Sequence, residues 1–345
     1  MDNLSLAAKL PIILGTLALA ALLTMGYTGY HVARDALLVA GQARVRTIVD
    51  SKLMEIDAWY SVVSGDLKSL ASSPQMGRAV RDFSAAWQRI GDDPAAFLKE
   101  RYLTRNPYAR GERHKLENPS DVSDYSIAHN RYHGGFVSVF EEKGYHDILL
   151  VDTSGNILYT VAKESDLGQN IFTGPLRTSE LARTARRVMQ SPDADVLFSD
   201  FAFYAPTPGE AASFVGAPVR SVDGRVLGAL VFQISAGQLT ALIERQSGAG
   251  LGGLTYLVGK DHRLRTNVGE DGQTALKLRS TAEALKTAFR DGHVVSYENG
   301  LFGVPSLLVT GHLSRPGLDL ALVHEVPQAE LLAPVVALLR RTALG

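Results

Sequence analysis

The sequence predicts an α+β protein in which one membrane-spanning helix continues into a long helix and is followed by two antiparallel sheet modules. Three observations predict this architecture. Residues 10–30 form an uncharged apolar run, residues 31–72 contain no proline and have helical spacing, and strand-and-turn patterns occur twice after residue 145. The 345 residues are enough for two such modules and a sizeable core.

Residues 10–30 are long enough to be a transmembrane helix. About 20 apolar residues at a rise of ~1.5 Å each cover the ~30 Å hydrocarbon core. Tyr27 and Tyr30 lie at the far end of the run, where tyrosine suits the membrane interface. A cleavable signal peptide is the alternative, but its apolar core is normally shorter. We expect an uncleaved anchor, with Lys9 as the only basic residue before it and residues 1–9 in the cytoplasm.

The segment after the anchor has the apolar spacing of a long helix. Steps of four and three residues predict one seam, which packs on its own domain and, near the membrane, also pairs two chains as a homodimer. The seam consists of Val45, Val49, Leu53, Ile56, Tyr60, Val63, Leu67 and Leu70. Ser73-Pro74 ends this helix.

Shorter helical segments follow, around residues 76–90, 93–104 and 124–143, and Gly144 is a plausible C-cap for the last one. Residues 106–122 are polar and rich in proline, glycine and charge, so they read as a loop.

The first sheet module is predicted at residues 145–235. HDILLVD and ILYTV flank a Thr-Ser-Gly-Asn turn as a hairpin, and a helix follows at 178–189. VLFSDFAFYA, ASFVGAPVRS and VLGALVFQIS are three further strand candidates. Two strands, a helix and three strands describe a small antiparallel sheet with helices on one face, which resembles the PAS plan.

The second sheet module, residues 251–327, repeats this plan in shorter form after a connecting helix and joint at 236–250. LTYLVG and HRLRTN form a predicted hairpin, 280–289 a helix, and VVSYE, SLLVTGHLS and LALVHEV strands. A final helix over 328–345 leads toward a second membrane span beyond Gly345. The glycines at 248–253 follow a helix and precede a strand, so we expect a joint and not a phosphate-binding loop.

This arrangement resembles the double Cache (dCache) domains of bacterial chemoreceptors, sensor histidine kinases and membrane cyclases. RYLTRNPY, RYHGGF, GYHDILLVDTSGNILYTVAKESDLGQNI and FSDFAFYAP carry the resemblance, as do ASFVGAPV, GRVLGALVFQIS and the later GLTYLVGKDHRLRTN. It covers most of residues 31–330. The resemblance implies a periplasmic sensor domain on the bacterial inner membrane, with the ligand in the membrane-distal first module and a helix displacement that signals inward.

Candidate ligand-binding residues gather around the first module. Strand alternation places Asp200 and Tyr204 on one face, where they could bind a ligand amine or hydroxyl. Tyr145, Asp147 and Tyr159 come from the hairpin that would line the same cavity. Tyr132 and His133 stand where amino-acid-binding members carry an Arg-x-Trp-Tyr run, which is absent here. Amines, organic acids and purines therefore all remain open as ligands.

Other functional classes receive little support. His129 and His133 share a helical face, but no third metal ligand follows by spacing, so we expect no metal site and no cofactor. The chain has no cysteine, which excludes thiol chemistry and disulfides. Lys plus Arg number 35 and Asp plus Glu 36, so no nucleic-acid partner is indicated. No nucleophile has an evident base, so we predict no enzyme. A partner-binding or structural ectodomain is the alternative.

Overall fold

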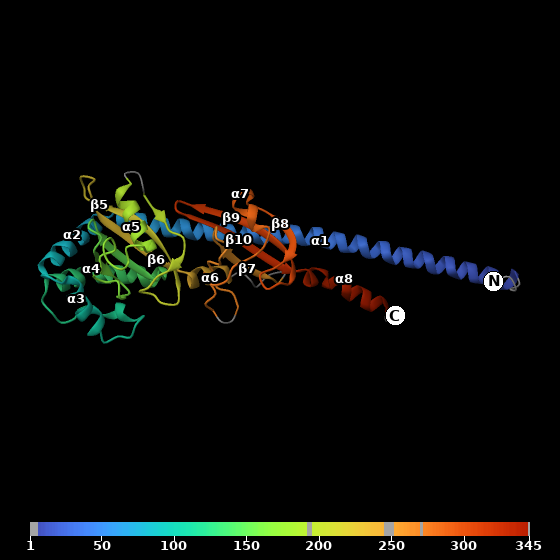
Figure 1. Ribbon diagram of the computed structural model, residues 1–345, viewed down its shortest axis with the longest axis horizontal. Helices are drawn as coiled ribbons and strands as arrows, with labels where there is room; N and C mark the ends of the chain where they lie inside the picture. Colours follow the sequence, from blue (N-terminus) through green and yellow to red (C-terminus); the bar gives the residue numbers. More distant parts are fainter. Residues whose placement is uncertain (1–5, 192–194, 245–251, 270–271, 344–345) are drawn as a thin grey trace.

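The computed structural model describes residues 6–191, 195–244, 252–269 and 272–343. Helix α1 (Leu6–Ala71) is continuous through the apolar run and the following segment, as predicted. At ~1.5 Å per residue its 66 residues extend about 100 Å. Figure 1 shows α1 running along both sheets and projecting well beyond them toward the N-terminus. The helix contains an apolar stretch of mean hydropathy 1.9 that is not buried and is long enough to cross a membrane.

The predicted seam on α1 packs largely within its own chain. Val45, Val49, Ile56, Tyr60, Val63 and Leu67 are at most 1% exposed, and Leu53 and Leu70 are partly buried against the same core. The expectation that this seam also pairs two chains is therefore wrong, because its side chains are already covered by the two sheets. A dimer formed through α1 would need another face of this helix.

A group of shorter helices caps the end of α1 that lies far from the N-terminus (Figure 1). Ser73 is the N-cap of α2 (Pro74–Arg89), and its hydroxyl accepts the Met76 N–H at 3.2 Å. The predicted helix at 93–104 is instead α3 (Pro94–Leu98) followed by a π-helical turn, η1 (Lys99–Thr104). Residues 105–123 form the predicted loop, with one 3₁₀ turn, η2 (Arg113–Lys115). Helix α4 (Asp124–Lys143) ends at Gly144, whose φ of 68° is the left-handed C-cap conformation.

The first sheet has the strand order β2-β1-β6-β5-β3, and β4 also pairs with β5. Its core strands are antiparallel, as predicted. Helices α1, α2 and α4 pack on one face, while α5 covers the other, so helices lie on both faces and not on one. The bounds are β1 (Asp147–Asp152), β2 (Ile157–Thr160), α5 (Glu180–Gln190), β3 (Leu197–Phe198), β4 (Ala202–Phe203), β5 (Ala211–Arg220) and β6 (Val226–Ser235).

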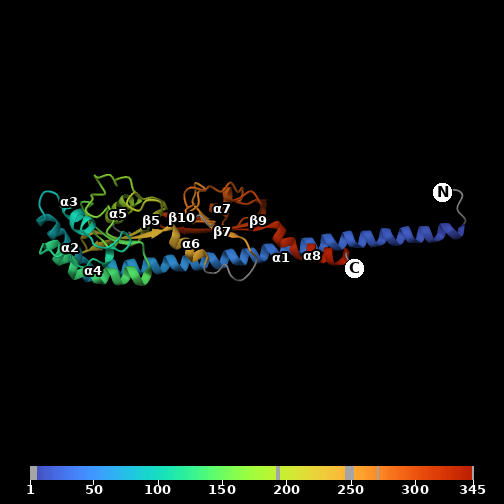
Figure 2. The same ribbon diagram turned by 90° about the horizontal axis from the view of Figure 1, so that it is seen from below.

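The second sheet has the order β7-β10-β9-β8, with α1 on one face and α7 on the other. Figure 2 shows the two sheets following one another along α1. Helix α6 connects the sheets, and α8 leaves the second one alongside α1. The bounds are α6 (Ala236–Glu244), β7 (Leu254–Val258), α7 (Leu285–Asp291), β8 (Val295–Asn299), β9 (Pro305–Arg315), β10 (Leu318–Pro327) and α8 (Gln328–Ala343).

Two predicted strands differ from the structure. The run at 196–205 is broken into the two-residue strands β3 and β4, because the Ser199 N–H bonds to Phe214 while Asp200 turns outward to another module. The run HRLRTN forms only isolated bridges, Val258 with Leu264 and Arg263 with Arg279. Most of the glycine-rich joint at 248–253 lies outside the described residues.

Candidate functional site

A buried acidic cluster lies at the end of the first sheet where β1 begins. Asp147 starts β1, and Leu149 and Val151 of the same strand pack in the core on the α5 side, so alternation puts Asp147 on that side too. Gln233 of β6 is its partner in register and therefore points the same way. Glu164 and Asp166 join them from the loop after β2.

Hydrogen bonds hold the cluster together. Asp147 Oδ1 accepts the backbone N–H groups of Ile148, Val161 and Ala162 at 2.7–2.9 Å. The Tyr204 hydroxyl donates to Asp166 Oδ2 at 2.7 Å. The Thr207 hydroxyl donates to Glu164 and accepts from the Gln233 amide at 3.0 Å.

Three oxygens in this cluster have no hydrogen-bond partner. They are Asp147 Oδ2, Asp166 Oδ1 and Gln233 Oε1, and their side chains are fully buried. Buried polar atoms are normally paired, so three unpaired acceptors in one cluster require an explanation such as a bound donor. All three are acceptors when the carboxyls are ionised.

Burial changes the pKa values of the carboxyl groups in this cluster. Burial raises the pKa of Asp147 well above its ordinary value, and the neighbouring Asp166 raises it further. Burial likewise raises the pKa of Asp166 to about 6, although the hydrogen bond from Tyr204 opposes the shift. A positive charge beside these groups would lower both pKa values again.

An open cleft of about 450 Å³ adjoins the acidic cluster, and Glu164 and Thr207 line it. Arg110 of the 105–123 loop stands at its rim, pairs with Glu164 at 3.0 Å and donates to the Pro206 carbonyl. Tyr145 also lines the cleft, but its ring stacks on Phe232 with centroids 4.4 Å apart and its hydroxyl donates to Asp66 of α1 at 2.9 Å. The remaining lining residues are Gly111, Phe140, Gly144, His146, Ala162, Pro208 and Gln238.

A basic and aromatic cluster lies on the opposite face of the sheet, under α4. His133 Nε2 donates to the His114 carbonyl at 2.7 Å, so its Nδ1 accepts from the Tyr159 hydroxyl at 2.6 Å. The His129 ring stacks on His133 with centroids 4.2 Å apart, which confirms that the two share a face. Among the described residues, no group of three potential metal-binding side chains is close enough to hold an ion.

Lys163 is the most unusual member of this second cluster. It is 1% exposed and has a φ of 53°, a conformation that lysine rarely adopts. Its amino group lies 3.4 Å from His133 Nε2, which already donates elsewhere, and 3.5 Å from the Val161 carbonyl. Burial lowers the pKa of Lys163 to about 7. Burial, and to a smaller extent the positive charge of Lys163, lower the pKa of His133 to about 3.

The seven predicted site residues do not form one site. Asp147 and Tyr204 belong to the acidic cluster, whereas Tyr145 lines the adjoining cleft and bonds to Asp66 on the α1 side of the sheet. Tyr159 and His133 lie in the cluster on the other face. The Tyr132 hydroxyl donates to Asp82 of α2 at 2.6 Å, outside both clusters.

Asp200 does not share a face with Tyr204, because the strand is interrupted between them. Its carboxylate accepts the Phe201 N–H and two N–H groups of Arg265 from the second sheet module. Sequence analysis missed Lys163, Glu164, Asp166, Thr207 and Gln233. A charged run directly after an apolar hairpin strand was the one signal that could have indicated the first three.

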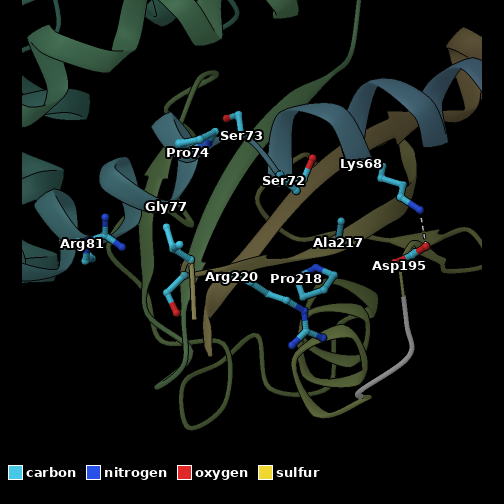
Figure 3. Close-up of a pocket in the computed structure, with 13 residues that line it drawn as sticks. Lys68, Ser72, Ser73, Pro74, Gly77, Arg81, Asp195, Ala217, Pro218 and Arg220 are labelled. Atoms are coloured by element: carbon cyan, nitrogen blue, oxygen red, sulfur yellow. Dashed lines mark hydrogen bonds and ion pairs between the residues drawn. The ribbon is translucent and has the colours of Figure 1, made fainter. Parts of the chain in front are cut away.

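A second cleft, of about 230 Å³, lies where α1 ends and α2 begins (Figure 3). Lys68, Arg81 and Arg220 line it, and Lys68 forms an ion pair with Asp195. Within the described part of the chain, none of the buried side-chain atoms that lack a partner belongs to this cleft. The acidic cluster is the stronger candidate because three of its own buried side-chain oxygens lack a partner, although the residues that carry them do not themselves line the adjoining cleft.

Comparisons with known proteins give fold similarities only. No protein-family model and no curated protein matches the chain. The ligand-binding domain of the Pseudomonas aeruginosa amino acid chemoreceptor PctC, in complex with GABA, is 13% identical with a TM-score of 0.48, covering 82% of this chain and 98% of that one. The ligand-binding domain of the Pseudomonas fluorescens chemoreceptor CtaA, in complex with L-alanine, is 13% identical with a TM-score of 0.46, covering 82% and 96%.

An extracellular domain described as that of a histidine kinase, rpHK1S-Z16, is 17% identical with a TM-score of 0.43, covering 79% of this chain and 98% of that one. Identities this low concern the fold alone. The structure itself confirms the predicted fold class, a long apolar N-terminal helix followed by two antiparallel sheets with helices.

Proposed function

We propose that this chain is the membrane-anchored, extracytoplasmic sensor of a bacterial transmembrane receptor of the dCache type, and that it binds a small molecule at the acidic cluster. The observation that carries this proposal is the set of three buried, unpartnered oxygens beside an open cleft. The continuous helix from the apolar run to both sheets supports a role in signalling across a membrane, because it would connect the ligand module to the span.

The chemistry of the cluster favours a ligand with a cationic amine. Ionised Asp147 and Asp166 would repel an organic acid, and Glu164 is already paired with Arg110, while an ammonium group donates up to three hydrogen bonds to the unpartnered oxygens. Of the ligands left open by the sequence, amines therefore fit better than organic acids. Purines offer N–H donors but no full positive charge at neutral pH.

A thermal-shift screen of the full chain in nanodiscs tests this function. The panel pairs amines and diamines with carboxylates of the same carbon skeleton, and adds amino acids and purines. Because a ligand that binds only the folded state stabilises it, we expect a concentration-dependent rise in melting temperature with at least one amine and none with its matched carboxylate. A panel in which nothing shifts the melting temperature would count against the sensor and in favour of a partner-binding ectodomain.

We further propose that the receptor is a homodimer in the inner membrane, with residues 1–9 in the cytoplasm and the sheets in the periplasm. A second seam on α1 supports the dimer. Val32, Ala36, Val39 and Ala43 are spaced by four, three and four residues and are all exposed. This seam lies between the apolar run and the sheets, so two chains that span one membrane could pair there.

A further inference from the structure

Residues 197–207, which we call the strap, connect the acidic cluster to the second sheet module. One end of the strap belongs to the cluster: Tyr204 donates to Asp166 at 2.7 Å, and Thr207 bridges Glu164 and Gln233. The strap contains only the two-residue strands β3 and β4, so few ladder hydrogen bonds fix it to its own sheet.

The other end of the strap is fastened to the second sheet module. Asp200 accepts two hydrogen bonds from Arg265, one from Nε and one from Nη2, each at 2.7 Å. The Arg265 side chain is 4% exposed and also donates to Asp261 at 2.8 Å, so it is held on both sides. Paired N–H groups on a carboxylate fix direction as well as distance, so this contact can transmit a displacement.

The strap backbone also meets the turn between β9 and β10. The Phe198 N–H donates to the Pro316 carbonyl at 2.8 Å. At Gly317, where φ is 94°, an added Cβ would lie 2.1 Å from the Phe198 carbonyl oxygen, so the approach leaves no room for a side chain. The second sheet module therefore contacts the strap at two separate places, Arg265 and the turn at Pro316-Gly317.

Helix α1 joins the same contact. Arg315, which precedes this turn, donates to the Asp57 carbonyl at 2.7 Å and to the Ser61 hydroxyl at 2.8 Å. The Phe198 ring packs edge-on against Tyr60 with centroids 5.3 Å apart. The strap, the second sheet module and the helix that leads to the membrane thus meet at one place.

We propose that the strap transmits the state of the acidic cluster to the second sheet module through the Asp200–Arg265 pair. Only three residues separate Asp200 from Tyr204, so a displacement of the Tyr204–Asp166 contact would move the Asp200–Arg265 pair through a short segment of backbone. Asp200 is thus a coupling residue and not a ligand-binding one. The inference rests on the proposed function for what changes the cluster, but the coupling itself is a property of the protein without ligand.

A ligand-free test compares hydrogen–deuterium exchange of the full chain in nanodiscs. Tyr204→Phe perturbs the end of the strap at the acidic cluster, because it removes the hydroxyl that donates to Asp166. Asp200→Asn weakens the Asp200–Arg265 pair but leaves the ion pair between Arg265 and Asp261 in place. We expect Y204F to change exchange at residues 263–267 and 312–318 as well as at 161–168. In the D200N background, Y204F should still change 161–168 but no longer 263–267 or 312–318.

Asp223→Asn is the matched control, because it removes a surface ion pair with Arg225 inside the first module. In that background, Y204F should act as it does in the unmodified chain. The proposal is overturned if Y204F never changes exchange in the second module, or if it does so equally with and without D200N. Because no ligand is added, failure to find a ligand for the receptor would leave this result unaffected.

Discussion

Asp166 shows how a single residue sets the behaviour of the site. Burial raises the pKa of its carboxyl to about 6, so this group takes up a proton just below neutral pH. A cationic ligand binds the ionised form and must displace that proton when the pH is lower. Ligand affinity should therefore be coupled to pH in a direction fixed by this residue.

We predict that an amine ligand binds more weakly as the pH falls through about 6, the pKa of Asp166. Calorimetric titration one pH unit below and one unit above this value measures the effect. One coupled carboxyl gives at most about tenfold weaker binding per pH unit below its pKa, and Asp166→Asn should reduce the dependence to the part contributed by Asp147, whose pKa burial also raises. Affinity that is constant across this range, or that strengthens on acidification, contradicts the assignment of Asp166.

Side chains at the residue scale were predictable only where a regular strand fixed their direction. Asp147 begins β1 and faces the α5 side, as strand alternation indicates, whereas Tyr145 precedes the strand and its side chain packs on the α1 side. Asp200 was misplaced because its segment is not a continuous strand, so alternation does not apply across it. Lys163, Glu164 and Asp166 were overlooked because a charged run after a hairpin has the composition of a solvated loop, and only tertiary packing buries it.

At the scale of elements, helices were predicted more closely than short strands. Helix α4 has the predicted bounds, and α1 is continuous through the predicted anchor. Their apolar spacing and caps are local signals that a sequence carries by itself. Strands β3 and β4 depend on pairing with β5, and HRLRTN meets its neighbours only through the isolated bridges Val258–Leu264 and Arg263–Arg279, which no local sequence signal distinguishes from a continuous strand.

The second seam of α1, which consists of Val32, Ala36, Val39 and Ala43, gives a prediction for the dimer. The naturally cysteine-free chain allows a single cysteine to be placed at Val39, which is 66% exposed at the centre of the proposed seam. Mild oxidation of Val39→Cys in membranes should give a covalent dimer at a yield well above that of Val222→Cys, an exposed control in the first sheet module. Equal yields for the two variants would exclude this seam as the dimer interface.

At the scale of the whole molecule, the order of parts fixes which region faces outward. The apolar part of α1 projects beyond the sheets, and α8 runs to the same side (Figure 1). If residues 10–30 span the inner membrane with the N-terminus inside, every loop of the first sheet module lies in the periplasm. The β5–β6 turn at Val222 would be among the parts farthest from the membrane.

We predict that Val222→Cys reacts with a membrane-impermeant maleimide in cells whose outer membrane alone has been permeabilised. A cysteine at Leu19, inside the apolar run, should stay unlabelled under the same conditions because it lies in lipid. Labelling of Val222→Cys only after the inner membrane is lysed would place the sheets in the cytoplasm and refute the proposed orientation.

The central claim is that the acidic cluster binds a small amine. Its most direct measurement is calorimetric titration of the full chain in nanodiscs with the amine that gives the largest thermal shift, comparing the unmodified chain with Asp147→Asn, Asp166→Asn and Asp223→Asn. We expect one ligand per chain, binding that is weakened at least about tenfold by D147N and by D166N, a loss of about 1.4 kcal/mol or more each, and unchanged affinity in D223N. Binding that survives both cluster substitutions unchanged would contradict it.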